Sequence, residues 1–402
     1  MTSANWLPSR VRRNFQIDVF TAVCAGIFVS VLVTFMTVVV RRMGGSTVDV
    51  ALVVGGPFFG HMLAPFFTLF LQRFHPVRVV AGTTTVARLV FIGGVLLATT
   101  PFMLSITSVV FWVITVSNVA VYTSLMQGIY PDRERAFIMG KVRVGASVSG
   151  IVAAMVAGLF IDVVAAQWVF AFAGIIALPG AVAFYRIRYD ANGAAVPRSD
   201  PTAIVRDVWR DRRYRQLLLS FLIFGWGNLM NFAVFPIMLV DNFDAPNTFV
   251  GIMSALQSAT MVFAYVIVGR LIDRGSSLRQ TMIGTLLVML MPLGYILAPS
   301  YWFLLPLAIV GGITQANGEL TYYTNVVQLA PPDRIAEYTA AQSLLLGIRG
   351  TLAPFAASAL LAAFEPRAVL AIGLVFMVGG AIVMSGVVRE SARVEPAVAP
   401  AA

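Results

Sequence analysis

The sequence predicts an all-α membrane protein with about twelve transmembrane helices in two similar six-helix halves. Three observations predict this fold class: the composition, a succession of long apolar segments and an internal repeat. Hydrophobic residues make up 59% of the 402 positions and charged residues 11%, whereas a soluble domain carries about 25% charged residues. Most of the chain is therefore expected to lie in lipid.

Long apolar segments follow one another almost from end to end. Each is about 20 residues long, which is enough for a helix to cross a hydrocarbon layer of roughly 30 Å. Polar and apolar residues do not alternate within them, so the pattern does not indicate transmembrane strands. We expect spans at residues 16–40, 49–71, 79–99, 101–125, 140–162, 166–187, 215–240, 248–270, 280–299, 302–327, 336–362 and 367–388.

Basic residues lie mainly in alternate connections between these spans. Arg73 and Arg78 follow the second span, and Arg274 follows the eighth. Because positive residues favour the cytoplasmic side, both termini are expected in the cytoplasm and the protein in the cytoplasmic (inner) membrane. Arg41, Arg42 and Arg367 are exceptions to this pattern. Topology thus accounts for the net charge of +10, and no nucleic-acid partner is expected.

One polar segment divides the apolar runs six and six. The sequence therefore predicts a six-helix bundle at 1–187, a cytoplasmic linker at 188–214, a second six-helix bundle at 215–388 and a cytoplasmic tail at 389–402.

The two halves repeat each other at a constant offset of 201 residues. Without any gap, this shift aligns Tyr122, Thr123, Gln127, Pro131, Asp132 and Arg133 with Tyr323, Thr324, Gln328, Pro332, Asp333 and Arg334. The same shift places the first six spans on the last six, which predicts parallel repeats. Parallel repeats in transporters are related by an axis along the membrane normal and form a central site where they meet.

The loop after the eighth span reads Gly269-Arg270-Leu271-Ile272-Asp273-Arg274-Gly275 and is followed by Arg279. It resembles the loop motif of the major facilitator superfamily, and the resemblance extends over the whole chain. The first-half loop has Gln72 where an aspartate is usual, so its gate is expected to be weaker or built differently. The resemblance implies a cytoplasmic gate made by Arg73, Arg78, Asp132, Arg133, Gly269, Arg270, Asp273, Arg274, Asp333 and Arg334. Topology and helix capping alone are the structural alternative.

In this superfamily spans one, four, seven and ten line a central cavity, and polar residues in this chain agree with that arrangement. Amides, phenols and a carboxyl on such faces could orient a small polar solute. Small polar residues also join helices to one another, so each has a structural alternative. The candidates are Asn118 and Tyr122 on span four, Asn228 and Asn231 on span seven, and Gln315, Glu319 and Tyr323 on span ten.

Ionisable residues within the spans are further candidates, because a charge near the bilayer centre costs about 3 kcal/mol or more unless water or a partner meets it. Glu319 could carry a coupling proton or form a fixed ion pair with Arg349, and Arg349 could instead bind an anionic solute. Asp18 opens span one, where the helix N-terminus stabilises a carboxylate and proton coupling is a second possibility. Arg88 and His61 lie deep in spans three and two, where a structural role is the default.

Nothing in the sequence indicates catalysis. There is no GxxxxGK[ST] loop for ATP, no Ser/His/Asp constellation and no cluster of metal ligands, and the chain has one cysteine and two histidines. We therefore expect no enzyme and no cofactor, but a monomeric secondary transporter that moves a small solute by alternating access, with proton coupling as a hypothesis. Export by antiport is slightly favoured over uptake by symport. A non-transporting receptor or scaffold on the same fold is the other alternative.

Overall fold

The computed structural model describes residues 8–71, 73–189, 208–331 and 334–394. Every regular element within these ranges is a helix, as predicted. The chain divides into two compact units, one formed by Met1–Ala195 with Asp244–Ala259, and the other by Val196–Phe243 with Thr260–Ala402. Most of the predicted linker, positions 190–207, lies outside the described residues.

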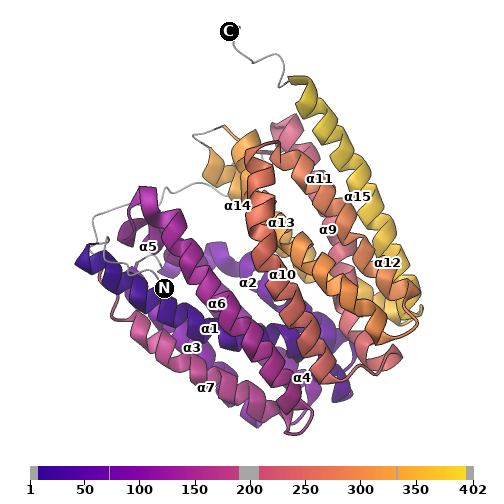
Figure 1. Ribbon diagram of the computed structural model, residues 1–402, viewed down its shortest axis with the longest axis horizontal. Coiled ribbons are helices and arrows are strands. Elements are labelled where there is room, and N and C mark those ends of the chain that lie inside the picture. The colour runs from indigo at the N-terminus through magenta and orange to yellow at the C-terminus, as the bar shows by residue number, and fades with distance from the viewer. Residues whose placement is uncertain (1–7, 72, 190–207, 332–333, 395–402) are drawn as a thin grey trace. The chain divides into compact units, whose positions relative to one another are not determined.

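The first unit is built around its first helix. That helix packs against the sixth and seventh, while the third packs against the fourth and seventh (Figure 1). The helices are α1 (Ser9–Arg42), α2 (Thr47–Leu71), α3 (Pro76–Leu97), α4 (Pro101–Val116), α5 (Val119–Ile129), α6 (Asp132–Ile161) and α7 (Ala166–Phe184). The first part of α10 (Asn247–Asp273) also belongs to this unit, as far as Ala259.

The second unit repeats this design. Its first helix, α9, packs along α15 and α14, and α11 packs on α13. The elements are α9 (Arg212–Ile237), the π-helical turn η1 (Met238–Asn242), the rest of α10, α11 (Ser277–Val288), α12 (Leu290–Leu297), the 3-10 turn η2 (Tyr301–Leu304), α13 (Leu305–Leu329), α14 (Ile335–Leu361) and α15 (Pro366–Val394). In Figure 1 the yellow α15 runs beside α9.

Each of the twelve predicted spans falls on helix. Within the described ranges, nine helices are long and apolar enough to cross a membrane, and the bent pair of α4 and α5 would make a tenth. The helix α2 is counted only as a shorter apolar helix, Thr47–Leu63. The helix α13 is not among the nine, and it carries Gln315, Asn317 and Glu319 within its length. These polar side chains lower the mean hydropathy of α13.

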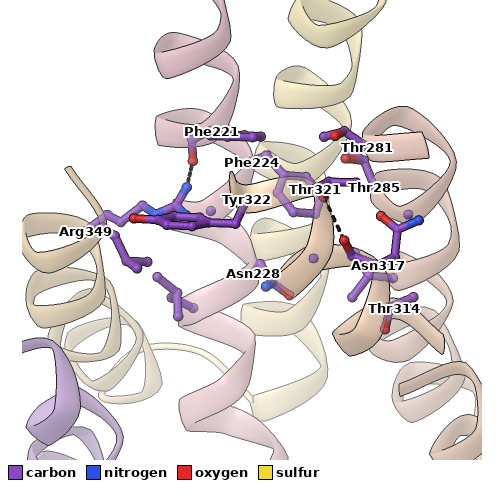
Figure 2. Close-up of a pocket in the computed structure, with 16 residues that line it drawn as sticks. Phe221, Phe224, Asn228, Thr281, Thr285, Thr314, Asn317, Thr321, Tyr322 and Arg349 are labelled. Atoms are coloured by element: carbon purple, nitrogen blue, oxygen red, sulfur yellow. Dashed lines mark hydrogen bonds between the residues drawn. The ribbon is translucent and has the colours of Figure 1, made fainter. Parts of the chain in front are cut away.

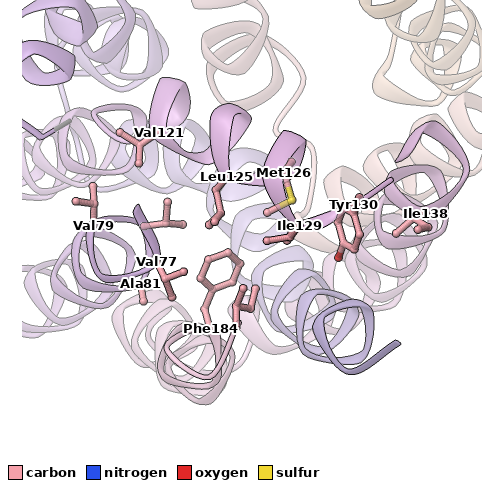
Figure 3. Close-up of a cluster of buried hydrophobic side chains, with 12 residues drawn as sticks. Val77, Val79, Ala81, Val121, Leu125, Met126, Ile129, Tyr130, Ile138 and Phe184 are labelled. Carbon is pink, nitrogen blue, oxygen red and sulfur yellow. The ribbon is translucent and has the colours of Figure 1, made fainter. Parts of the chain in front are cut away.

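The buried apolar cores of the two units show the same repeat as the loops. In the first unit Val77, Leu125 and Ile129 belong to one buried cluster at the ends of α3 and α5, drawn in Figure 3. In the second unit a buried cluster contains Leu278, Val326 and Ala330, each 201 positions later. The repeat found in loop residues therefore extends to the packing of the helices, because equivalent helix faces are buried in both units.

Candidate functional site

The second unit contains a cavity among α9, α11, α13 and α14. Its volume is about 230 Å³, somewhat below the range of about 300 to 1,000 Å³ that is usual for ligand pockets. Figure 2 shows its polar groups arranged around an open centre. The lining residues are Phe221, Phe224, Gly225, Asn228, Leu229, Thr281, Gly284, Thr285, Val288, Thr314, Asn317, Gly318, Thr321, Tyr322, Leu346 and Arg349.

Arg349 is the one charged residue among those that line the cavity. It stands about midway along α14, and its Nη1 donates a hydrogen bond to the backbone carbonyl of Phe221 on α9. One turn further along α9, Gly225 gives the guanidinium its space, since a Cβ there would lie 2.0 Å from Nη1 and 2.8 Å from Nε. The position of Arg349 therefore depends on a glycine in the facing helix.

The remaining donors of Arg349 have no partner in the described part of the chain. Nε is buried without a hydrogen bond, and Nη2 makes none to a described residue. Tyr322 lies beside the guanidinium in Figure 2, with its hydroxyl 3.0 Å from Ser343 Oγ. The cavity thus holds a cation without a protein counter-ion among its lining residues.

Hydroxyl and amide groups line the part of the cavity formed by α11 and α13. Thr281, Thr314 and Thr321 each donate to a backbone carbonyl of the preceding turn, at 3.0, 3.1 and 2.8 Å. Across from them on α9, the Asn228 side chain forms no hydrogen bond within the described ranges, so its amide is available to a ligand. A polar solute would therefore meet fixed hydroxyl groups on one side and a free amide on the other.

The sequence and the structure emphasise different faces of α13. Gln315, Glu319 and Tyr323, the predicted candidates, have exposed side chains and do not line this cavity. Glu319 accepts a hydrogen bond from the Tyr265 hydroxyl of α10. Since Arg349 bonds to a backbone carbonyl instead, the structure shows no ion pair between Glu319 and Arg349.

Sequence reasoning missed the cavity residues of the same helix. Thr314, Asn317 and Thr321 are spaced three and four residues apart, which puts them on one stripe of α13. That spacing was available in the sequence, but two polar stripes compete on α13 and periodicity does not say which one faces a cavity. Tyr322, next to Arg349, and Thr281 and Thr285 of α11 were missed as well.

Two predicted asparagines have structural surroundings. Asn231 is fully buried, its Nδ2 lies 3.5 Å from Met377 Sδ, and a Cβ at Gly373 would lie 2.2 Å from its Oδ1. It fits tightly between α9 and α15. Asn118, at the break between α4 and α5, donates to Thr83 Oγ1 at 2.5 Å. The Asn118 contact accounts for that amide as a helix-joining group, whereas Asn231 Oδ1 is buried without a hydrogen-bond partner in the described ranges. Any role of either residue in solute binding stays a prediction.

A buried carboxylate lies within α1 in the first unit. The helix begins at Ser9, nine residues before Asp18, so the prediction that Asp18 opens the helix and is stabilised by its N-terminus is wrong. Asp18 is 2% exposed and its Oδ2 accepts a hydrogen bond from the Tyr130 hydroxyl at 2.9 Å. No described cation forms an ion pair with it. Tyr122, also predicted, is half-buried nearby, close enough to interact electrostatically with Asp18 and Arg143. The Asp18 carboxylate therefore accepts a hydrogen bond from a single donor among the described residues.

Arg88 and His61 are not assembled with other predicted residues. Arg88 is 4% exposed, and its Nε and Nη1 are buried without hydrogen-bond partners in the described structure. His61 is half-buried on α2. Their roles stay predictions.

The predicted cytoplasmic gate residues lie at helix ends. Arg334 pairs with Glu337 in the first turn of α14, at 2.6 Å. The side chains of Arg73, Arg78, Arg270, Asp273 and Arg274 are exposed, and Gly269 is half-buried beside them. Asp333 and the side chains of Asp132 and Arg133 lie outside the described residues. The gate itself stays a prediction.

A further contact joins the end of α6 to the start of α10 within the first unit. Asp162 accepts hydrogen bonds from the backbone N–H groups of Asn247 and Thr248, at 3.2 and 3.0 Å, and from both of their side chains, at 2.8 Å each. Partial burial raises the pKa of this carboxyl, but the bonds from Thr248 and Asn247 outweigh it and lower the pKa below its ordinary value. The sequence offered no motif for this contact.

Two glycines allow the same helices to approach closely. A Cβ at Gly251 would lie 2.7 Å from the carbonyl oxygen of Ala154, and one at Gly158 would lie 2.9 Å from that of Asn247. Arg42 stands 3.9 Å from Asp162 and donates to the carbonyl of Ala245. The α6–α10 contact, defined by Asp162, Asn247, Thr248, Gly158 and Gly251, is therefore both tight and polar.

The family model of the major facilitator superfamily matches residues 19–244 and 217–402, which together take in nearly the whole chain. The chain belongs to the major facilitator superfamily. As a member, it is an integral membrane transporter of small molecules with the fold of a secondary transporter that works by alternating access, and not an enzyme. The predicted resemblance is thus confirmed over both repeats.

Solved structures of transporters share the fold. A point mutant of the nucleoside transporter NupG is 13% identical, with a TM-score of 0.73 over 93% of this chain and 99% of that one. A bacterial homologue of the human lysosomal transporter Spinster, inward-facing and occupied, is 15% identical, with a TM-score of 0.68 over 94% and 96%. No curated protein sequence gives a significant match. At these identities the likeness shows the fold alone.

Proposed function

We propose that this transporter carries a small polar solute and that the cavity of the second unit forms part of its binding site. The observation that supports this proposal is the lining of the cavity. Half of the lining residues bear amide, hydroxyl, phenol or guanidinium groups, although the helices that carry them are otherwise apolar. Polar groups that converge on a small apolar pocket are the usual mark of a ligand site.

The test is transport by the purified protein in proteoliposomes, with a panel of small polar solutes. Asn228→Ala is expected to weaken transport of the accepted solute about 10-fold, because it removes the free amide of the cavity. Ser385→Ala is the matched control, since that hydroxyl is exposed on α15 and bonds to its own helix at Ile382. Transport that is unaffected by Asn228→Ala would contradict the placement of the site, and a panel that yields no transport would contradict the function.

We further propose that Asp18 couples transport to protons. A buried carboxylate with one described donor, the Tyr130 hydroxyl, loses its desolvation penalty when it takes up a proton. Tyr122 and Tyr130 interact electrostatically with Asp18, and Arg143 interacts electrostatically with Tyr122. Location in the inner membrane with cytoplasmic termini, and a monomeric state, belong to the same proposal and rest on the basic loops and the sequence.

Proton movement can be read with a pH-sensitive dye inside the vesicles. If solute and protons move together, addition of solute outside acidifies the lumen; if they exchange, the lumen becomes more alkaline. Asp18→Asn is expected to abolish the dye signal by removing the proton site while leaving solute binding in the second unit measurable. A proton flux that persists in Asp18→Asn would exclude this residue as the coupling group.

A further inference from the structure

We infer that the solute is a small organic anion whose carboxylate or phosphate group binds Arg349. This inference rests on the proposed solute site in the second unit. It names the class of solute, which the polar lining alone does not.

The charge of the cavity favours an anion. Arg349 is the single charged residue in the lining, and no carboxylate forms an ion pair with it in the described part of the chain. A buried charge without a partner is costly in a membrane, and one backbone carbonyl offsets only part of that cost. A solute carboxylate or phosphate would supply the negative charge that the lining residues do not offer to Arg349.

The geometry of the guanidinium favours an oxyanion. Nη1 is held by the carbonyl of Phe221, whereas Nε and Nη2 have no partner among the described residues. These two nitrogens form one edge of the planar group, and this edge matches the two oxygens of a carboxylate or phosphate. Gly225 leaves room for the guanidinium in this position, because a Cβ at that residue would lie 2.0 Å from Nη1 and 2.8 Å from Nε.

The other residues that line the cavity indicate the size and polarity of the remainder of the solute. Asn228 lies on the same stripe of α9 as Phe221 and Gly225, at intervals of four and three residues, and its free amide can bond to a hydroxyl or carbonyl group. The threonine hydroxyls of α11 and α13 lie across the cavity from Arg349 in Figure 2. The volume of about 230 Å³ suits a compact molecule. A soluble organic acid or phosphate with a neutral polar group at its other end fits these features better than a lipid.

The experiment is thermal unfolding of the full-length protein in detergent at fixed ionic strength, with matched anionic and neutral probes. The anions are glycerol 3-phosphate and 4-hydroxybenzoate, and the neutral partners are glycerol and 4-hydroxybenzamide. Lysophosphatidate tests a lipid source of the same phosphate group. At least one of the two soluble anions is expected to raise the unfolding midpoint by about 2 to 5 °C at 100 times its Kd, while its neutral partner does not.

The variants separate the charge from its position. Arg349→Gln is expected to weaken binding of the anion about 10- to 100-fold, and Arg349→Lys to restore part of that loss. Gly225→Ala keeps the charge of Arg349 but displaces its guanidinium, so it should weaken binding of the anion while the variant remains folded. Arg367→Gln is the matched control, because it removes an exposed arginine that contacts the carbonyl of Ala298 outside the cavity.

Four results would overturn the inference: no midpoint shift with either soluble anion, equal shifts with the neutral partners, full anion affinity in Arg349→Gln, or stabilisation by lysophosphatidate alone. Transport of glycerol or 4-hydroxybenzamide that depends on Asn228 but not on Arg349 would contradict the anionic class and leave the proposed function standing. Anion binding that depends on Arg349, without transport of any probe, would support the binding site and contradict the proposed function.

Discussion

Replacing Asp162 by alanine is expected to loosen the start of α10 from the end of α6. The carboxylate accepts two backbone and two side-chain hydrogen bonds from Asn247 and Thr248. Loss of a helix N-terminal cap costs about 0.5 to 2 kcal/mol, and each side-chain bond contributes about 0.5 to 1.5 kcal/mol net. Because the Asp162 side chain is 30% exposed, we take the lower half of these ranges and expect a loss of about 2 kcal/mol.

The assay is thermal unfolding of the purified protein in detergent as a function of pH. The hydrogen bonds hold the pKa of Asp162 below its ordinary value of 3.8, so the bound form is the ionised one. Its contribution to stability is therefore complete above the unfolded-state pKa and is lost as the pH falls through the folded-state pKa. The difference in midpoint between wild type and Asp162→Ala should be constant at about pH 6 to 8 and should shrink below about pH 4.

Two controls make the result specific. Asp162→Asn keeps one acceptor oxygen and should lose about half as much stability and all of the pH dependence. Asp273→Ala removes an exposed carboxylate at the other end of α10, and the midpoint should not change. If Asp162→Ala unfolded at the wild-type midpoint at neutral pH, or if the difference grew in acid, the ionised Asp162 would not be what holds the start of α10 to α6.

Two further predictions concern packing. Gly251→Leu should lower the unfolding midpoint at least as much as Asp162→Ala, because even its Cβ would lie 2.7 Å from the Ala154 carbonyl oxygen. An unchanged midpoint would show that α6 and α10 can separate freely. Transport assays on the same variant would show whether the α6–α10 contact limits the rate of turnover. Tyr214→Phe should lower the free energy of unfolding by about 1 to 2 kcal/mol, since the buried hydroxyl lies 2.9 Å from the carbonyl oxygen of Tyr338 and 3.0 Å from Gln342 Oε1. Chemical denaturation measures this loss. A loss below about 0.3 kcal/mol would mean that water replaces the hydroxyl.

Some site residues were predictable because their chemistry is unusual for their place. Arg349 and Asn228 were candidates from the sequence and both line the cavity. An arginine in the middle of an apolar helix is conspicuous whatever surrounds it. Asp18 was a candidate as an ionisable residue at the expected start of span one, and the structure adds its hydrogen-bond donor, Tyr130, which lies 112 residues away along the chain.

The helices and the internal repeat could be predicted from the sequence alone. Lipid leaves the backbone no other hydrogen-bond partners, so each span must appear as a long apolar run that can be counted. The offset of 201 residues places Leu278 of the second core on Val77 of the first, because equivalent helices bury equivalent faces.

Which polar groups contact one another became known only from the packing of the helices. Periodicity gives α13 two polar stripes, and the packing of α11 and α14 selects Thr314, Asn317 and Thr321 for the cavity. The bonds of Asp162 to the start of α10 cross about 85 residues of sequence with no local signal. Contacts of this kind depend on distances between helices, and those distances are set by side-chain volumes at many positions at once, not by the pattern of any one segment.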